Sequence, residues 1–555
     1  MQRVEIAEDW MELRPEYAEA VHVRPRPRPL TRLELAGLGV LGIVFLGLAG
    51  RLMSTPLSRD ENLFLTVARL GGTQDIYRDL GYNHLPILPW LLGGLYDLVG
   101  TEHFLLVARL LVLAGWATAL GAIWLICRRT EAGFLAFFTA ACLLMGNVLL
   151  LGGAGMLATN NLLPLAPALL AFYALLHGIG STRPVPLACF AAGVLVSCAI
   201  GLKANYIFLA PFFALATLFA PASRGFALRL LAGTLPLAAG GLLAGLPVLM
   251  YVLFDTQSFF AHTLRYFTEL QPAYWAASSE PKVDTLAARV LLAESIWLAN
   301  ATLLSLVGIV ALALIPAMRT NMRESLRLVR GWSVVLALGL AATGFVVAFV
   351  PSPSFPQYFV PPIPFLILAV VLLRARTATP DLPGAQAVLG AVALLALVGC
   401  ASRIGPGLVQ LARPQQWETI SLHRDMRALA REAGFYGGER VATLTPALAL
   451  AGNFAVPPEF AAGQFVYRVA PYIPEGDRRY YTTTSAAGLA AFLDAAPPPA
   501  ILISGEEKLE EPFRAYALSH GYTGFRRRHK GRTIELYRRP DATPHLPPAG
   551  GPSTL

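Results

Sequence analysis

The amino-acid sequence predicts a polytopic α-helical membrane protein that ends in a small C-terminal α/β domain. Three observations support this fold class. Hydrophobic residues make up 55% of the 555-residue chain, charged residues only 14%, and the mean hydropathy is +0.55. Apolar runs close to the ~20 residues that a membrane-spanning helix needs recur from Leu33 to about Arg403. Beyond residue 404, shorter helix-like and strand-like patterns alternate.

About eleven of the apolar runs are expected to span the membrane. The net charge of +9 is carried by 40 Arg and four Lys, and most of these arginines lie in short loops between the runs. Such arginines orient a membrane protein, so the charge does not indicate nucleic-acid binding. The predicted spans are 33–51, 104–126, 133–152, 160–177, 186–202, 204–220, 230–254, 290–316, 331–350, 356–373 and 386–402.

One further apolar stretch, 85–99, has 15 residues, two prolines and an aspartate. If it lies on the membrane surface, eleven loop arginines share the side of the N-terminus, and the opposite short loops 153–159 and 351–355 hold no Lys or Arg. If it spans, all eleven move to the other side. The positive-inside rule therefore favours a surface position and a cytoplasmic N-terminus. The arginines are Arg128, Arg129, Arg183, Arg224, Arg229, Arg319, Arg323, Arg327, Arg330, Arg374 and Arg376.

This topology divides the chain into four regions. They are a cytoplasmic tail (1–32), a transmembrane domain (33–403) with external loops at 52–103 and 255–289, an extracytoplasmic α/β domain (404–540) and a disordered Pro/Gly-rich tail (541–555). The first external loop is expected to form two amphipathic surface helices, about 60–70 and 85–99. In the C-terminal domain we expect helices at 417–433 and 507–520, strands at 440–444 and 500–504, and a hairpin at 524–539. No cysteine follows Cys400, so that domain has no disulfide framework.

Asp60 and Glu61 follow the first span directly, in "SRDENLFLTVARL". One interpretation is helix capping, because acids at the first turn satisfy free amides and the helix dipole. The other is a carboxylate held just outside the bilayer, where a partly desolvated acid can serve as a general base. Both interpretations can hold at once.

Lys203, in "CAIGLKANYIF", is the first lysine of a chain that otherwise uses arginine. It is expected at the external end of the fifth span, on the same side as Asp60. An interfacial lysine that snorkels is one interpretation. A compact ammonium beside a carboxylate also suits a phosphate leaving group.

Further polar residues are expected on the same face. Asn160 and Asn161 mark the end of the fourth span and could cap a helix or bind a polar ligand. His84 precedes the second surface helix, where a structural role and a site role both remain open. His262 and Arg265, at i and i+3, share a helix face in the second external loop. Together these residues describe a site for an anionic polar head group presented from the lipid.

Several other chemistries are not indicated. The chain has no Cys/His cluster with metal-ligand spacing, no Gly-Lys-Ser/Thr phosphate loop and no GxSxG motif. No cofactor is therefore predicted, and no ligand set indicates a divalent cation.

The order of these motifs resembles the GT-C glycosyltransferases. The shared features are Asp-Glu after the first span, an aromatic and Pro-containing surface helix, Gly-x-Lys at the end of span five, and "SFPQYFVPPIPFLIL" (354–368) near the last spans. The chain looks most like the branch that contains protein O-mannosyltransferases, lipid A aminoarabinose transferases and rhizobial core-galacturonic-acid transferases. The likeness covers about 33–540, and "RVATLTPALALAGNFAVPPEF" is similar to the external domain of the aminoarabinose transferases.

The resemblance implies an inverting enzyme that uses a polyprenyl-phosphate sugar. Asp60 would deprotonate the acceptor hydroxyl, Lys203 would neutralise the departing lipid phosphate, and Tyr358 would lie near the lipid-phosphate groove. Two positions depart from the family pattern. Asn160 stands where an acid is usual, and His84-Leu85 replaces a Glu-Lys pair of the aminoarabinose branch. These departures argue against a simple transfer of the aminoarabinose activity.

The leading hypothesis is thus a GT-C glycosyltransferase of the bacterial inner membrane. Its partners would be the lipid bilayer, a polyprenyl-phosphate sugar donor and a glycolipid, polysaccharide or protein acceptor of the cell envelope; nucleic acid is not among them. The rivals are a transporter or flippase of lipid-linked sugars, which would bury charges or break helices at mid-membrane, and a non-catalytic assembly partner.

Overall fold

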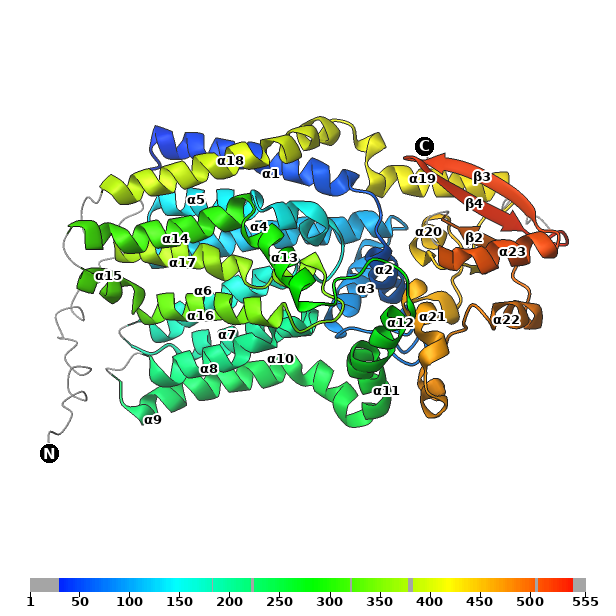
Figure 1. Ribbon diagram of the computed structural model, residues 1–555, viewed down its shortest axis with the longest axis horizontal. Coiled ribbons are helices and arrows are strands. Elements are labelled where there is room, and N and C mark those ends of the chain that lie inside the picture. The colour runs from blue at the N-terminus through cyan, green and yellow to red at the C-terminus, as the bar shows by residue number, and fades with distance from the viewer. Residues whose placement is uncertain are drawn as a thin grey trace.

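A computed structural model describes residues 29–181, 183–220, 224–319, 322–377, 383–504 and 508–542. Long helices run side by side along the longest axis of the molecule, and the C-terminal elements lie together beyond one end of this bundle (Figure 1). Short helices lie between the two parts. Most of the predicted tails, 1–32 and 541–555, lies outside the described residues.

Each predicted span coincides with a helix of the bundle, although some helices are short or broken. The helices are α1 (Arg32–Ser54), α4 (Phe104–Arg129), α5 (Phe134–Met145) with a π-helical turn at Leu150–Ala154, α6 (Leu165–Ile179), α7 (Pro186–Leu202), α8 (Leu209–Phe219) after a 3-10 turn at Ala204–Phe208, α9 (Phe226–Arg229) continuing through Leu230–Thr234 into α10 (Leu235–Phe254), α13 (Leu286–Trp297), α14 (Asn300–Arg319), α15 (Met322–Val329), α16 (Trp332–Val347), α17 (Ile363–Arg376) after Pro356–Phe359, and α18 (Pro383–Leu411).

Five helices among the described residues are long and apolar enough to cross a membrane, or six if the bent pair α13 and α14 counts as one span. The other apolar helices have 10–17 residues, and the 13-residue α3 (Ile87–Val99) is one of them. The chain is thus a helical membrane protein, and the count of eleven spans stays a prediction.

Small residues allow the bundle helices to pack closely. A Cβ added to Gly193 of α7 would lie 1.9 Å from the Leu237 carbonyl oxygen of α10, and one added to Gly240 would lie 2.0 Å from that of Phe190. In membrane proteins such glycines let backbones approach where larger side chains would separate them. The spacing of α7 and α10 therefore depends on these two glycines.

The two predicted juxtamembrane helices are α2 (Arg59–Leu70) and α3, which pack on each other. The expectation that α2 lies on the surface is wrong, because its side chains from Glu61 to Ala68 are buried. The C-terminal region covers this helix: the Ala447 amide donates to Asn62 Oδ1 over 3.1 Å. The helix is therefore covered by protein from Glu61 onward, whereas Arg59 at its start is exposed and Asp60 is partly buried.

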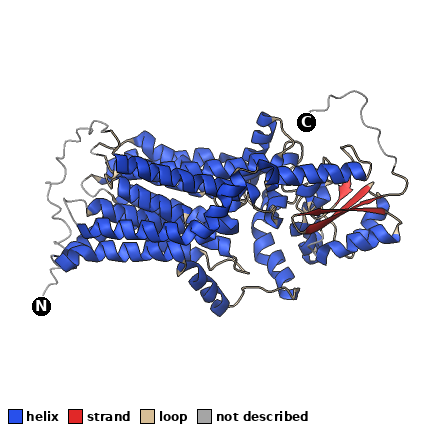
Figure 2. Cartoon of the chain, turned by 90° about the horizontal axis from the view of Figure 1, so that it is seen from above, coloured by secondary structure: helices blue, strands red, loops and turns tan. Residues whose placement is uncertain are grey.

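The C-terminal region contains a four-stranded sheet with the order β1-β2-β4-β3, seen at one end of the chain in Figure 2. β1 (Val441–Ala442) pairs parallel with β2 (Ala500–Ile503), and β2 pairs antiparallel with β4 (Arg532–Arg538). β3 (Thr523–His529) and β4 form the predicted hairpin, with His529 opposite Arg532. Its turn residues Lys530 and Gly531 have φ of 44° and 91°, as a tight two-residue hairpin turn requires.

Helices surround this sheet. Two of them were expected, α19 (Glu418–Glu432) and α23 (Glu511–Ser519), whereas the predicted strand 440–444 is only the two residues of β1. The segment 446–495 was not predicted to form helices, and it carries most of the short ones. These are α20 (Pro446–Ala451), Pro458–Phe460, α21 (Gln464–Val469), Ala470–Tyr472, Glu475–Tyr480 and α22 (Leu489–Ala495), while Pro414–Gln416 and Lys508–Glu510 lie outside it.

The second external loop joins the bundle to the C-terminal region. It forms α11 (Thr256–Phe260), a π-helical segment (Ala261–Leu270) and α12 (Gln271–Ala277). The Tyr481 hydroxyl donates to the Ala261 carbonyl oxygen over 2.7 Å, and the Tyr266 hydroxyl donates to that of Phe465 over 3.2 Å. Residues of both parts therefore meet at the end of the bundle where α1 ends and α4 begins.

Candidate active site at the end of the bundle

Asp60 lies at the second position of α2, where the bundle, the second external loop and the C-terminal region meet. Ser58 is the N-cap residue: its hydroxyl accepts from the Glu61 amide, and the Glu61 carboxylate accepts from the Ser58 amide. This capping box leaves the Asp60 side chain without a role in the cap. No hydrogen bond or ion pair joins Asp60 to any residue that the structure describes. A carboxylate with unoccupied oxygens is therefore available to a ligand.

The electrostatic environment of Asp60 suits a proton acceptor. Burial raises the pKa of its carboxyl above the ordinary value, and the positive charges of Arg468 and Lys203 oppose that shift. Because the two cations favour the ionised form, the carboxyl can be charged before a substrate binds and take a proton during a reaction.

Glu61, the adjacent acid, has a different environment. Its side chain is fully buried, and Arg109 of α4 donates to it from Nε over 2.6 Å and from Nη2 over 2.7 Å. The Ala158 amide donates to the same carboxylate over 2.7 Å. Glu61 thus ties α2 to α4 and to the loop before α6, and both of its oxygens are occupied. Its predicted contact with a substrate stays a prediction.

Lys203 follows the last residue of α7, in extended backbone between two helices. Its ammonium donates to Asn161 Oδ1 over 2.5 Å and lies 5.7 Å from the ring centroid of Tyr358. Burial lowers the pKa of Lys203 to about 7, while the charge of Asp60 raises it. The structure therefore groups Asp60, Lys203 and Tyr358, three residues that the sequence analysis assigned to the site.

The two asparagines have different surroundings. Asn161, not Asn160, contacts Lys203, and its amide also donates to Thr159 Oγ1 over 2.9 Å. Asn160 is buried, and its Nδ2 has no hydrogen-bond partner among the described residues. Asn161 positions the ammonium, while a substrate contact of Asn160 stays a prediction.

His84 belongs to the same neighbourhood. Its ring packs against those of Phe64, Tyr82 and Phe267, with centroids 5.2–5.8 Å away, and its Nδ1 lies 2.6 Å from Asn83 Oδ1. Burial and the nearby charge of Lys203 lower the pKa of His84 to about 3. His84 is therefore neutral at physiological pH.

His262 and Arg265 contact the C-terminal region instead of Asp60. His262 Nε2 lies 2.8 Å from the Tyr480 carbonyl oxygen, and Arg265 Nη1 lies 2.6 Å from Asp477 Oδ2. Both residues lie in the π-helical segment Ala261–Leu270. They dock the second external loop onto 475–481.

Arg468 is the charged residue that sequence reasoning missed. It lies in α21, and its positive charge acts on both Asp60 and Tyr358. The one sequence signal is an arginine within the apolar, aromatic stretch "QFVYRVAPY". No spacing rule connects that stretch with Asp60, because the two lie at opposite ends of the chain.

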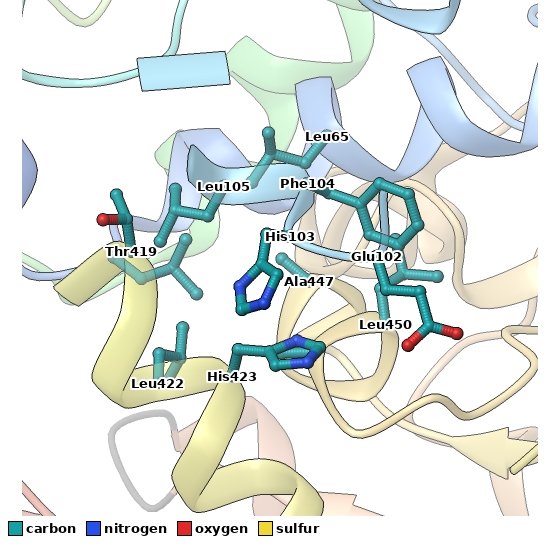
Figure 3. Close-up of a pocket in the computed structure, with 12 residues that line it drawn as sticks. Leu65, Glu102, His103, Phe104, Leu105, Thr419, Leu422, His423, Ala447 and Leu450 are labelled. Carbon is teal, nitrogen blue, oxygen red and sulfur yellow. The ribbon is translucent and has the colours of Figure 1, made fainter. Parts of the chain in front are cut away.

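The described residues hold no metal-ligand group beside Asp60, and one small cavity lies apart from it. No group of three or more His, Cys, Asp or Glu residues in the described ranges could hold a metal ion. A separate cavity of about 20 Å³ lies between α4 and α19, where His103 and His423 meet (Figure 3). That volume holds about one water molecule, so it cannot receive a sugar.

The chain shares its fold with solved membrane glycosyltransferases of the GT-C superfamily, as the resemblance implied. The particular similarity is to ArnT from Cupriavidus metallidurans, a lipid A aminoarabinose transferase. Its structure bound to undecaprenyl phosphate aligns with a TM-score of 0.56 at 15% identity, over 92% of this chain and 98% of that one. The apo structure of the same protein gives a TM-score of 0.52 at 15% identity, over 91% and 97%.

The other comparisons do not add to the assignment of the fold. The oligosaccharyltransferase AglB from Archaeoglobus fulgidus, in complex with an inhibitory peptide and a dolichol-phosphate, aligns with a TM-score of 0.46 at 12% identity, over 93% of this chain and 75% of that one. No protein-family model and no curated protein matches the chain. The two ArnT structures therefore establish the fold and leave the substrate of this chain open.

Proposed function

We propose that this protein is an integral-membrane glycosyltransferase that moves a sugar from a polyprenyl-phosphate donor to a hydroxyl group of a cell-envelope acceptor. The observation that carries the proposal is the unpaired Asp60 carboxylate, which is under the influence of two cations, Lys203 and Arg468. A base and a cation for a leaving phosphate are the two groups that such a transfer needs.

In the proposed reaction, Asp60 is the base and Lys203 stabilises the leaving phosphate. Asp60 takes the proton of the acceptor hydroxyl as its oxygen attacks the anomeric carbon from the face opposite the phosphate. The bond between the anomeric carbon and the phosphate oxygen breaks, and its electron pair stays on the phosphate. Lys203 stabilises the charge that develops there, because its ammonium can donate to phosphate oxygens. The sugar is therefore transferred with inversion.

The lipid-linked donor is expected at the membrane side of the site. Lys203 follows the end of α7, and Tyr358 precedes the start of α17, so both lie where bundle helices end. The ArnT structure with undecaprenyl phosphate supports this class of donor, since it has the same fold. The proposed location is the periplasmic face of a bacterial inner membrane.

The rival transporter function is less well supported. A transporter site would place charges or broken helices midway along the bundle. The bundle does contain breaks, at Gly152 and between α13 and α14, but the three charges proposed for the site lie elsewhere. Asp60 is in α2, Lys203 follows α7 and Arg468 is in α21, and α2 and α21 lie where the bundle meets the C-terminal region (Figure 1).

The test is sugar transfer by the purified full chain in lipid nanodiscs, with undecaprenyl-phosphate-linked sugars as donors. Transfer to an envelope glycolipid, polysaccharide or protein fraction, with release of undecaprenyl phosphate, is the expected result. Movement of intact donor across liposomes without release of undecaprenyl phosphate would replace this proposal with the transporter function.

A further inference from the structure

The C-terminal region contributes one cation, Arg468, to the site of Asp60. Its guanidinium carbon lies 5.1 Å from the ring centroids of Tyr274 and Phe465 and 5.7 Å from that of Trp275. These rings hold the planar group from several sides. Its Nε is buried and has no hydrogen-bond partner in the described part of the chain. The guanidinium also forms a side-chain hydrogen bond with Tyr266, which orients it and leaves the buried Nε as the donor that an acceptor oxygen can use.

The charges near Asp60 do not balance. Glu61 is neutralised by Arg109, and His84 is neutral at physiological pH. Three cations, Arg468, Lys203 and the exposed Arg59, therefore act on the single charge of Asp60. Neither Lys203 nor Arg468 lies within salt-bridge distance of Asp60 among the described residues. A lipid phosphate beside Lys203 would neutralise the charge of that lysine. The charge of Arg468 would still lack an anionic partner, and a second negatively charged group could supply one.

The positions of the two cations differ. Lys203 and Tyr358 lie where bundle helices end, on the side from which a lipid-linked donor arrives. Arg468 lies in α21, within the C-terminal region. The acceptor must reach Asp60 from a direction that the donor leaves open, which is the side of the C-terminal region.

We propose that Arg468 binds an anionic group, a phosphate or a carboxylate, that the acceptor carries close to its reacting hydroxyl. This inference rests on the proposed function and specifies its acceptor as an anionic glycan or glycolipid. The guanidinium fork fits either oxyanion through two parallel hydrogen bonds. A charge-assisted contact of this kind changes affinity by about 10- to 100-fold.

The test measures binding and requires no transfer activity. The full chain in nanodiscs is titrated with inorganic phosphate, glucuronate and neutral glucose, first without and then with saturating undecaprenyl phosphate. The lipid occupies the position beside Lys203, and the two anions distinguish phosphate from carboxylate recognition. We compare wild type with Arg468→Gln, Arg468→Lys and Asp477→Asn. Asp477→Asn is the matched control, because it removes the ion pair with Arg265 that docks the same two segments.

We expect the lipid-loaded wild type to bind phosphate or glucuronate at least ~10-fold more tightly than glucose. Arg468→Gln should lose this preference, Arg468→Lys should keep part of it, and Asp477→Asn should keep all of it. An equal preference in Arg468→Gln would overturn the proposal. So would absence of anion binding by wild type, or complete displacement of the anion by undecaprenyl phosphate, which would assign Arg468 to the donor. Failure of undecaprenyl phosphate to bind, seen in its own titration, would contradict the proposed function separately.

Discussion

The guanidinium of Arg109 donates to both carboxylate oxygens of Glu61, at 2.6 and 2.7 Å, and both side chains are fully buried. Asp60, one residue earlier, has no such partner among the described residues. The two acids of one helical turn therefore differ in role: one holds the structure together, and the other faces the site.

Glu61→Gln should destabilise the protein strongly, because it leaves the buried Arg109 charge without a carboxylate. Removing one partner of a buried pair costs about 3–5 kcal/mol. The double variant Glu61→Gln/Arg109→Gln should cost less than the sum of the single variants, since no charge stays buried alone. Thermal unfolding in detergent at constant pH measures all three variants. If the destabilisation of the double variant equalled the sum of the two single variants, Glu61 and Arg109 would not stabilise the protein as a pair.

Asp60→Asn should leave the stability of the protein nearly unchanged and reduce its rate of sugar transfer. The carboxylate makes no hydrogen bond or ion pair in the described structure, so the unfolding temperature should stay close to that of wild type. The rate of sugar transfer should fall by ~10²–10⁴, because an amide cannot take the acceptor's proton. Initial rates at matched amounts of folded protein test this. Nearly full activity in Asp60→Asn would place the base elsewhere.

The pH dependence of kcat/KM should be bell-shaped. Asp60 acts only when deprotonated, so the rate rises with pH through its raised pKa; Lys203 acts only when protonated, so the rate falls above its pKa of about 7. Lys203→Arg keeps its charge at all of these pH values and should lose the alkaline fall. An alkaline fall that persists in Lys203→Arg would assign that limb to another group.

Acid should weaken the contact between α4 and α19. The rings of His103 and His423 have centroids 4.0 Å apart (Figure 3), and burial lowers the pKa of His423 to about 4, helped by His103 and Arg427. An unfolded histidine titrates near ~6.5. Between these values the unfolded chain binds more protons, so the histidine's contribution to stability is present above about 6.5 and is lost as the pH falls toward 4.

His423→Phe removes the titrating group and should flatten the fall of the unfolding temperature between pH 6.5 and 4. The control is His520→Phe, since His520 follows the last residue of α23 and is more exposed than His423. Equal slopes in wild type and His423→Phe would show that other groups control acid stability.

Topology can be tested with single cysteines. Leu518 is 63% exposed in the C-terminal region, and Arg128 is exposed at the opposite end of the bundle. In intact cells stripped of the outer membrane, Leu518→Cys should react with an impermeant maleimide, whereas Arg128→Cys should react only after lysis. The reverse pattern would invert the proposed orientation and place the Asp60 site in the cytoplasm.

Much of the helical fold follows from the sequence. Apolar runs of ~20 residues predict where helices lie, because each run must satisfy its own backbone within the segment. The β3–β4 hairpin is equally local, since its turn and alternation lie within 524–539. Arginine placement also predicted that Asp60 and Lys203 share one end of the bundle, and the structure confirms this.

Tertiary structure decided what each polar residue contacts. Periodicity could not show that Arg109 neutralises Glu61, or that Asn161 and not Asn160 reaches Lys203. It also could not show that α2 is covered, since the covering residues come from the C-terminal region. The sequence by itself predicted the helices and placed Asp60 and Lys203 at one end of them; their roles in a reaction stay predictions. Only the tertiary structure could bring Arg468 to Asp60, because that approach depends on the packing of segments with no local relation to each other.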